Sequence, residues 1–282
     1  MRSGSLHPKA FLYWEYALSG AYLAALKNAP IIMVKESNAA LIREYVRENM
    51  KTGGTIYLLG GIVALPDTIV EGMNGYTIKR LSGDTRYETN LEILKEAFKD
   101  SGASSKEILV CSGKSFADSL SASATKKPIL LVDKKLSAVQ KDFLESLNVE
   151  KIYIIGLEAA VNVKIESEVQ AYGVVERVGG LTRYETSVEI AKVFFDNPEK
   201  LVLASAKNFP DGLSAGPLAV CMDAPLVLTN TGNESAAIAY AQQVGISTGA
   251  VLGGPTIISD NTVRTIFTMD ANSEIIVKKY ND

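Results

Sequence analysis

The chain repeats itself at a spacing of about 97 residues, and this repeat limits its folds more than any other feature of the sequence. The segment Arg80–Thr89 (RLSGDTRYET) returns as Arg177–Thr186 (RVGGLTRYET), with seven of ten positions identical at an offset of 97. Sequence repeats of this kind arise from similar structural units that pack on one another. Other segments repeat at nearly the same spacing: PIIM, PILL and PLVL begin at Pro30, Pro128 and Pro225, and YLLG, YIIG and AVLG begin at Tyr57, Tyr153 and Ala250.

We therefore predict three modules, spanning residues 1–79, 80–176 and 177–282. The first module is expected to be incomplete, because its copy of the second motif, Tyr13–Gly20 (YWEYALSG), stands close to the start of the sequence. From the sequence, this module lacks both the strand and the Arg-Tyr-Glu-Thr helix that would precede that motif. Such an incomplete unit would leave an apolar surface, which raises the expectation of a homo-oligomer.

The second module alternates short apolar runs with longer amphipathic segments. Runs such as Ile108–Cys111 suit strands that are buried on both faces of a parallel sheet. Leu91, Leu94 and Phe98 fall on one face of a helix. Strands that alternate with helices favour an α/β fold of three Rossmann-like modules with parallel sheets. The expected strands are 107–111, 128–132 and 151–155, and the expected helices are 85–99, 117–126, 137–147 and 161–171.

Composition excludes several classes of function. Lysine and arginine number 29 and aspartate and glutamate 32, so the net charge is −3, which argues against a general nucleic-acid binder. A single histidine, His7, makes Ser-His-Asp catalysis and histidine-rich zinc sites improbable, and we expect no metal and no cofactor. The two cysteines, Cys111 and Cys221, are expected to be buried free thiols. No apolar run is long enough to cross a membrane.

The Arg-Tyr-Glu-Thr motif has a structural explanation and a functional one. Thr85 and Glu88 fit a capping box at the start of a helix. Arg86 and Arg183 are not needed for capping, so they either pair with an acidic residue or, with the strand-borne Arg80 and Arg177, hold an anionic ligand.

The second repeated motif carries an acidic residue and a serine. Asp118 and Asp211 follow strand–loop segments that contain Lys114 and Lys207, at the sheet edge where ligands enter α/β folds. The alternative is that each aspartate is the N-cap of the helix that it opens. The matching serines are Ser19, Ser121 and Ser214; with no histidine as a base, they suit close helix packing or a hydrogen bond to a ligand better than nucleophilic attack.

The motifs Arg-x-x-Gly-x-x-Arg-Tyr-Glu-Thr, Phe-Ala/Pro-Asp-x-Leu-Ser-Ala and Pro-Ile-Leu-Leu, in this order, resemble the cell wall binding repeat 2 family of Gram-positive, especially clostridial, surface proteins. The resemblance implies three Rossmann-like or Toprim-like modules in a pseudo-threefold arrangement. It also implies noncovalent anchoring to an anionic secondary cell wall polymer, and hence a secreted protein at the cell wall. In this family the Pro-Ile-Leu-Leu segment is important for polymer binding. Its counterparts here, Pro128, Ile129, Leu130, Leu131 and Pro225, read as buried strand, so we expect them to shape the site.

Two classes of function follow, with a purely structural spacer that binds no ligand as a third alternative. The first is a non-catalytic wall anchor that binds an anionic glycopolymer through arginine and lysine clusters between modules, without inserting into a membrane. The second is an α/β enzyme acting on a phosphorylated or nucleotide substrate. An enzyme would need a single, non-repeated group of acid, base and metal-binding residues, and the sequence shows no such group. Motifs that are present in several copies suit recognition of a ligand better than catalysis.

Overall fold

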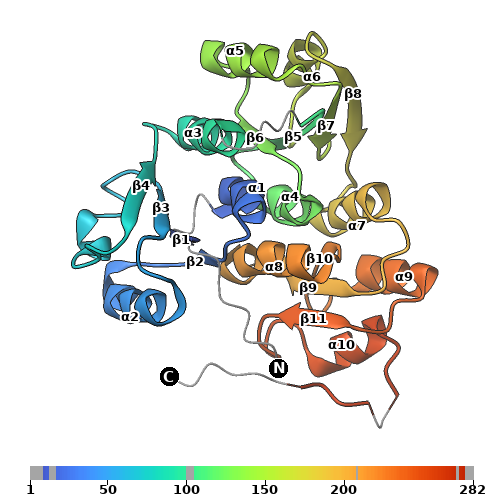
Figure 1. Cartoon of the computed structure of the whole chain (residues 1–282). Helices are drawn as coiled ribbons and strands as arrows, with labels where there is room; N and C mark the ends of the chain where they lie inside the picture. The colour runs from blue at the N-terminus through green and yellow to red at the C-terminus, as the bar shows by residue number, and fades with distance from the viewer. Residues whose placement is uncertain (1–8, 13–16, 100–104, 208, 271–272, 277–282) are drawn as a thin grey trace.

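The described part of the chain contains three parallel sheets, one for each repeat (Figure 1). The computed structural model describes residues 9–12, 17–99, 105–207, 209–270 and 273–276, without the side chains of residues 9–12, 17 and 209–211. His7 therefore lies outside the described residues. In this part of the chain, no helix is long and apolar enough to cross a membrane.

Module 1 is built on a sheet whose strand order is β2-β1-β3-β4. Its first strand, β1 (Lys9–Leu12), lies at the centre of the sheet between β2 and β3. The expectation that this strand is absent was wrong; Lys-Ala-Phe-Leu contains no β-branched residue, and pairing with its neighbours decides its conformation. The other elements are α1 (Ala17–Lys27), β2 (Ile31–Ile32), η1 (Glu36–Asn38), α2 (Ala39–Asn49), β3 (Thr55–Leu59), η2 (Asp67–Val70) and β4 (Thr77–Leu81).

Modules 2 and 3 repeat this plan, with strand orders β6-β5-β7-β8 and β10-β9-β11. The strands and helices expected in module 2 are all present within a few residues. Module 2 contains β5 (Glu107–Ser112), α4 (Phe116–Ala122), η3 (Ser123–Thr125), β6 (Ile129–Val132), α5 (Ala138–Leu147), β7 (Lys151–Ile155), α6 (Val163–Val169) and β8 (Val174–Val178). Module 3 contains β9 (Leu201–Ser205), α8 (Phe209–Met222), β10 (Leu226–Thr229), α9 (Ser235–Val244), β11 (Gly249–Leu252) and α10 (Asp260–Ile266).

Two helices join successive modules. After β4, the last strand of the first sheet, α3 (Arg86–Lys99) packs on β6 of module 2 and on α1 of module 1. In the same way, α7 (Arg183–Phe194) follows β8 and packs on β10 of module 3 and on α4 of module 2. The repeated motif thus straddles a junction: β4 crosses the boundary expected between residues 79 and 80, and β8 the one between 176 and 177.

The corresponding helices α1, α4 and α8 meet at the centre of the molecule (Figure 1). Each of them also contacts the edge strand of a neighbouring module: α1 contacts β6, α4 contacts β10 and α8 contacts β2. This cyclic pattern is the pseudo-threefold arrangement that the family resemblance implied.

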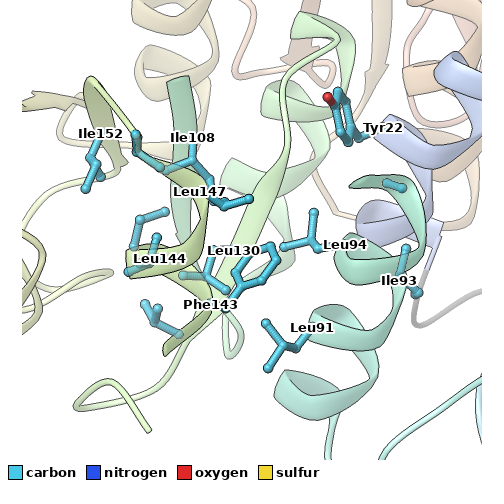
Figure 2. Packing of buried hydrophobic residues seen from close by; sticks show 14 of the residues in the cluster. Tyr22, Leu91, Ile93, Leu94, Ile108, Leu130, Phe143, Leu144, Leu147 and Ile152 are labelled. Carbon is cyan, nitrogen blue, oxygen red and sulfur yellow. The ribbon is translucent and has the colours of Figure 1, made fainter. Parts of the chain in front are cut away.

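The hydrophobic core runs across the module boundaries. One cluster joins Tyr22 of α1 to Leu94 of α3 and to Leu130 and Phe143 of module 2 (Figure 2). Phe98 lies between the aromatic rings of Tyr22 and Phe143, with centroid distances of 5.8 and 5.9 Å. Because apolar burial is the main favourable term in folding, the modules stabilise one another.

The connecting helices also complete the hydrogen bonding of the edge strands. Asn90 of α3, which is fully buried, donates to the Ile129 carbonyl at 2.8 Å and accepts from the Leu131 amide at 2.9 Å. Ser187 of α7 accepts from the Leu228 amide at 3.0 Å. These three outward-facing backbone groups of β6 and β10 therefore have partners, although no described strand pairs with that edge of either sheet.

Cys111 is buried as expected, but Cys221 is exposed. The apolar sequence around Cys221 belongs to α8, whose opposite face packs against α1 and α4. The helix is central to the molecule, and yet this position faces outward.

We predict that Asn90→Ala lowers the free energy of unfolding by about 2–4 kcal/mol, because two buried backbone groups lose their only side-chain partner. Urea denaturation followed by circular dichroism measures the change. Glu92→Ala on the same helix is the matched control; it removes only an exposed pair with Lys95 and should cost about 0.5 kcal/mol or less. An equal decrease in the free energy of unfolding in the two variants would contradict this role for Asn90.

Candidate binding sites at the module junctions

The repeated Arg-Tyr-Glu-Thr motif starts each connecting helix with a capping box. The Glu88 amide donates to the Thr85 hydroxyl oxygen at 3.3 Å, and the Glu88 carboxylate accepts from the Thr85 amide at 2.8 Å. Thr182 and Glu185 repeat these bonds at 3.2 and 2.9 Å. The capping prediction is therefore confirmed.

The glycine and the last threonine of the motif fix the turn before each helix. A Cβ placed on Gly83 would lie 2.3 Å from the Cβ of Glu88, so only glycine fits there. The Gly83 amide donates to the Thr89 hydroxyl oxygen at 2.9 Å. Gly180 and Thr186 have the same relationship, with an amide-to-hydroxyl distance of 3.1 Å. The motif thus holds each helix at a set position relative to the strand before it.

Arg86 and Arg183 reach from this first turn to the next module. Arg86 Nη1 donates to the Gly113 carbonyl after β5 at 2.9 Å, and Arg183 Nη1 donates to the Ala206 carbonyl after β9 at 2.8 Å. The salt bridges found among the described residues include neither arginine, so backbone carbonyls, and not the acidic partner that was one of the two alternatives, position them.

Arg80 and Arg177 bind within their own modules instead. Arg177 donates to the carbonyls of Gly156 and Val161 and forms an ion pair with Glu166 at 2.6 Å. Arg80 does the same with the carbonyls of Gly60 and Leu65 and with Asp67 at 2.7 Å. Their guanidinium groups hold the loops after β3 and β7, which leaves little capacity for a ligand.

The carboxyl ends of β5 and β6 bring together a group that we call the module-2 site: Arg86, Tyr87, Lys114 and Asp133. Lys114 Nζ lies 2.7 Å from the Asp133 carboxylate. Burial and the Asp133 charge raise the pKa of Tyr87, whereas Lys114 and Arg86 lower it, so these groups lie close enough to interact. The lysine charge in this site is balanced by the aspartate.

The module-3 site is the corresponding group, Arg183, Tyr184, Lys207 and Asn230. Asn230 occupies the position of Asp133; its amide donates to the Tyr184 hydroxyl at 2.8 Å and it accepts from the Ser205 hydroxyl at 2.9 Å. Lys207 is exposed and has no ion pair with any described residue. An anion arriving here would meet Arg183 and Lys207, neither of which forms a salt bridge with a described residue, although the buried carboxylate of Asp118 lies close enough to Arg183 to interact with it.

Asp118 lies in the first turn of α4, but it is not the N-cap, which is Ser115. The N-cap interpretation was therefore wrong. Asp118 is 7% exposed, and Gly156 leaves room for its carboxylate, because a Cβ on that glycine would lie 2.9 Å from Asp118 Oδ2. Burial raises the pKa of Asp118 to about 6, and the Arg183 charge partly offsets this rise. Asp118 thus lies near the module-3 site although it belongs to module 2.

The remaining predicted residues are distributed unevenly. Ser121 is buried in the junction of the central helices, whereas Ser214 is exposed. The side chain of Asp211 lies outside the described residues. Pro128, Ile129, Leu130, Leu131 and Pro225 are buried in or next to β6 and β10, so they are placed to shape a site.

Sequence reasoning missed Tyr87, Tyr184, Asp133 and Asn230. The tyrosines stand in the repeated motif, which was a usable signal. Asp133 and Asn230 differ in type, and each follows its repeated strand by one residue, so no repeat marked them. No three histidine, cysteine, aspartate or glutamate side chains in the described part of the chain are grouped so that they could hold a metal ion.

We predict that Asp118→Asn raises the free energy of unfolding at pH 7.5 by up to about 3 kcal/mol. The folded-state pKa of about 6 exceeds the unfolded value of 3.8, so the folded protein holds this proton more tightly. Ionisation of Asp118 therefore destabilises the protein increasingly between about pH 4 and pH 6 and fully above that range.

Urea denaturation of both proteins at pH 4 and pH 7.5 tests this prediction, because the other titrating groups cancel in the difference. The advantage of the variant should be present at pH 7.5 and absent at pH 4. A difference that does not change with pH would contradict a buried, ionisable Asp118.

Comparison with known proteins agrees with this threefold architecture. The family described as "Cell wall binding domain 2 (CWB2)" matches residues 8–70, 80–166 and 177–263. Over 216 residues, the chain is 29% identical to N-acetylmuramoyl-L-alanine amidase LytC of Bacillus subtilis, covering 74% of this chain and 42% of that protein. It is also 28% identical to the amidase enhancer of the same organism over 204 residues, which are 70% of this chain and 27% of the relative. The chain thus spans less than half the length of these relatives.

Solved structures show the same fold. Cwp8 from Clostridium difficile superimposes with a TM-score of 0.80 at 24% identity, over 95% of this chain and 48% of that one. Cwp6 from the same organism gives a TM-score of 0.77 at 23% identity, over 93% and 44% of the two chains. With three matched segments, one on each of its three modules, the chain belongs to the cell wall binding domain 2 family.

Proposed function

We propose that this chain is a non-catalytic anchoring region that binds an anionic secondary cell wall polymer noncovalently, in a protein exported to the cell wall. Membership of the family supports binding to the wall. The observation that carries the choice of an anionic ligand is that Arg183 and Lys207 are exposed at the junction of modules 2 and 3 without a salt bridge to any described residue, and that the buried, neutral Asn230 takes the position that Asp133 has in module 2.

The two sites differ in the charge that they offer. In the module-3 site, Lys207 is available to a phosphate or carboxylate of the polymer. In the module-2 site, Lys114 is already paired with Asp133. The module-3 site is therefore the stronger of the two, and the module-2 site adds to overall binding when one polymer chain engages both.

Most of the remaining candidate residues have a part in this proposal. Arg80 and Arg177 set the shape of the loops beside the sites, and the buried strand residues from Pro128 to Leu131 and Pro225 set the floor. Asp118 reduces the positive potential around Arg183, so its protonation below about pH 6 favours an anion. Ser121 contributes to helix packing.

Cosedimentation with purified, protein-free Gram-positive cell walls tests the proposal. One half of the walls is first stripped of secondary polymers by acid extraction, and both halves are assayed at low and high salt with and without a chelator. The expected result is pelleting with intact walls only, weakened by salt because surface charges are screened, and unchanged by the chelator. Equal recovery in both supernatants would reject the anchor.

We predict that Lys207→Ala weakens binding to intact walls by about tenfold, since one charge-assisted hydrogen bond to the polymer is lost. The matched control is Lys192→Ala on α7, which removes an exposed lysine paired with Glu189 away from the site. Binding curves over a range of wall concentrations give the change. If the two variants lose the same affinity, the module-3 site is not where the polymer binds.

Asp133→Asn gives the module-2 site the composition of the module-3 site and releases Lys114. We predict several-fold tighter binding to intact walls and a steeper dependence on salt concentration, because one more cation faces the polymer. If the variant binds intact walls more weakly while its unfolding midpoint is unchanged, Asp133 does not weaken binding by pairing with Lys114.

A further inference from the structure

The carboxylate of Asp118 has no bonding partner within the described part of the chain. The side chain is buried, yet no hydrogen bond or salt bridge to a described residue satisfies it, and Arg183 acts on it through its charge alone. An ionised carboxylate can accept about four hydrogen bonds, and buried polar groups in folded proteins nearly always have partners. A buried carboxylate without one indicates a group that binds to it from outside the chain.

The backbone that faces Asp118 is already engaged elsewhere. Gly156 follows β7, and a Cβ at this position would lie 2.9 Å from Asp118 Oδ2. The Gly156 amide donates to the Val178 carbonyl at 2.8 Å, and the Gly156 carbonyl accepts from Arg177 at 2.8 Å. Because both backbone groups of this glycine have other partners, Gly156 gives the carboxylate space but no hydrogen bond.

Solvent still reaches the carboxylate of Asp118. Several side-chain atoms in the described part of the chain are fully buried without a hydrogen-bond partner, among them Oγ of Ser119 and Ser121 on the same helix. Neither oxygen of Asp118 belongs to this group, although neither has a partner among the described residues. The carboxylate is therefore accessible to a small donor group such as a hydroxyl.

The charges of Arg183 and Asp118 limit which group can bind to the carboxylate. Asp118 would repel a second anion, and Arg183 would repel an ammonium group. A hydroxyl group is neutral and donates one hydrogen bond, so it can bind Asp118 while an anion on the same molecule binds Arg183. A sugar that carries a phosphate or a carboxylate has both groups within a few bonds of each other.

We propose that Asp118 is a specificity-determining residue of the module-3 site, where it accepts a hydrogen bond from a sugar hydroxyl next to the anionic group of the bound polymer. This inference rests on the proposed function, because it assigns a second contact to the same ligand. Asp118 disfavours every anion through its charge and compensates only those anions that bring a hydroxyl group. It therefore selects among anionic ligands and does not increase the affinity for all of them.

Two probes with the same phosphate group separate the two contacts. Glucose 1-phosphate carries hydroxyl groups on its six-membered ring, whereas cyclohexyl phosphate has a ring of the same size without hydroxyls. Chemical-shift titrations of the full 282-residue protein at pH 7.5, where Asp118 is ionised, give both dissociation constants. We expect glucose 1-phosphate to bind about tenfold more tightly, because it gains a hydrogen bond to a charged acceptor.

Two variants of Asp118 distinguish hydrogen bonding from charge. Asp118→Ala should abolish the preference for glucose 1-phosphate and tighten the binding of cyclohexyl phosphate, because the repulsion is removed. Asp118→Asn also removes the charge but keeps an acceptor oxygen, so it should retain part of the preference. The control is Asp142→Ala, at an exposed aspartate of α5, which should leave both dissociation constants unchanged. Equal preferences in the alanine and asparagine variants would show a role through charge alone and overturn the proposal.

Failure of this inference can be told apart from failure of the proposed function. If the unmodified protein binds the two probes with equal affinity, and Lys207→Ala weakens the binding of both, the anionic site stands but Asp118 does not select for a hydroxyl. If neither probe shifts the backbone amide signals of the module-3 site, the anionic site itself is rejected, and the role of Asp118 is rejected with it.

Discussion

The structure depends on the helix that each junction places over the edge strand of the following module. Asn90 and Ser187 give the outer backbone groups of β6 and β10 their partners, and the apolar faces of α3 and α7 join two modules into one core. An isolated α/β module of this size buries a modest core and has an open sheet edge. Sharing a helix between modules relieves both weaknesses, and it also brings the start of that helix to the carboxyl ends of the next strands.

That geometry explains why one short motif makes so many structural contacts. Within ten residues it binds a loop of one module through Arg80 or Arg177, turns at a glycine, caps a helix, and delivers Arg86 or Arg183 to a carbonyl of the next module. Most of the motif is needed for the joint itself. The part that differs between the sites is supplied by other elements, notably the aspartate or asparagine after β6 and β10.

Asp118 is the residue of this arrangement that lowers the stability of the folded protein. The residue is buried, and because its pKa is raised to about 6, its ionised carboxylate destabilises the folded protein at neutral pH. Residues that oppose stability in this way are found more often where they act on a ligand than where they only fill space. Its position beside Arg183 connects the central helices to the module-3 site and makes the charge of that site dependent on pH.

The repeat and the alternation of apolar runs with helical segments determined the number of modules, the α/β class and most elements of module 2 from the sequence alone, because both are local properties. The capping boxes were equally local. Tertiary structure alone decided that β1 is a central strand, that Asp118 is buried rather than capping, and that Cys221 faces outward. It also decided which arginines hold loops and which reach the next module, since motifs with the same sequence lie between different neighbours. Charge balance at the sites depends on side chains from separate strands and helices, which only the packing of the modules brings together.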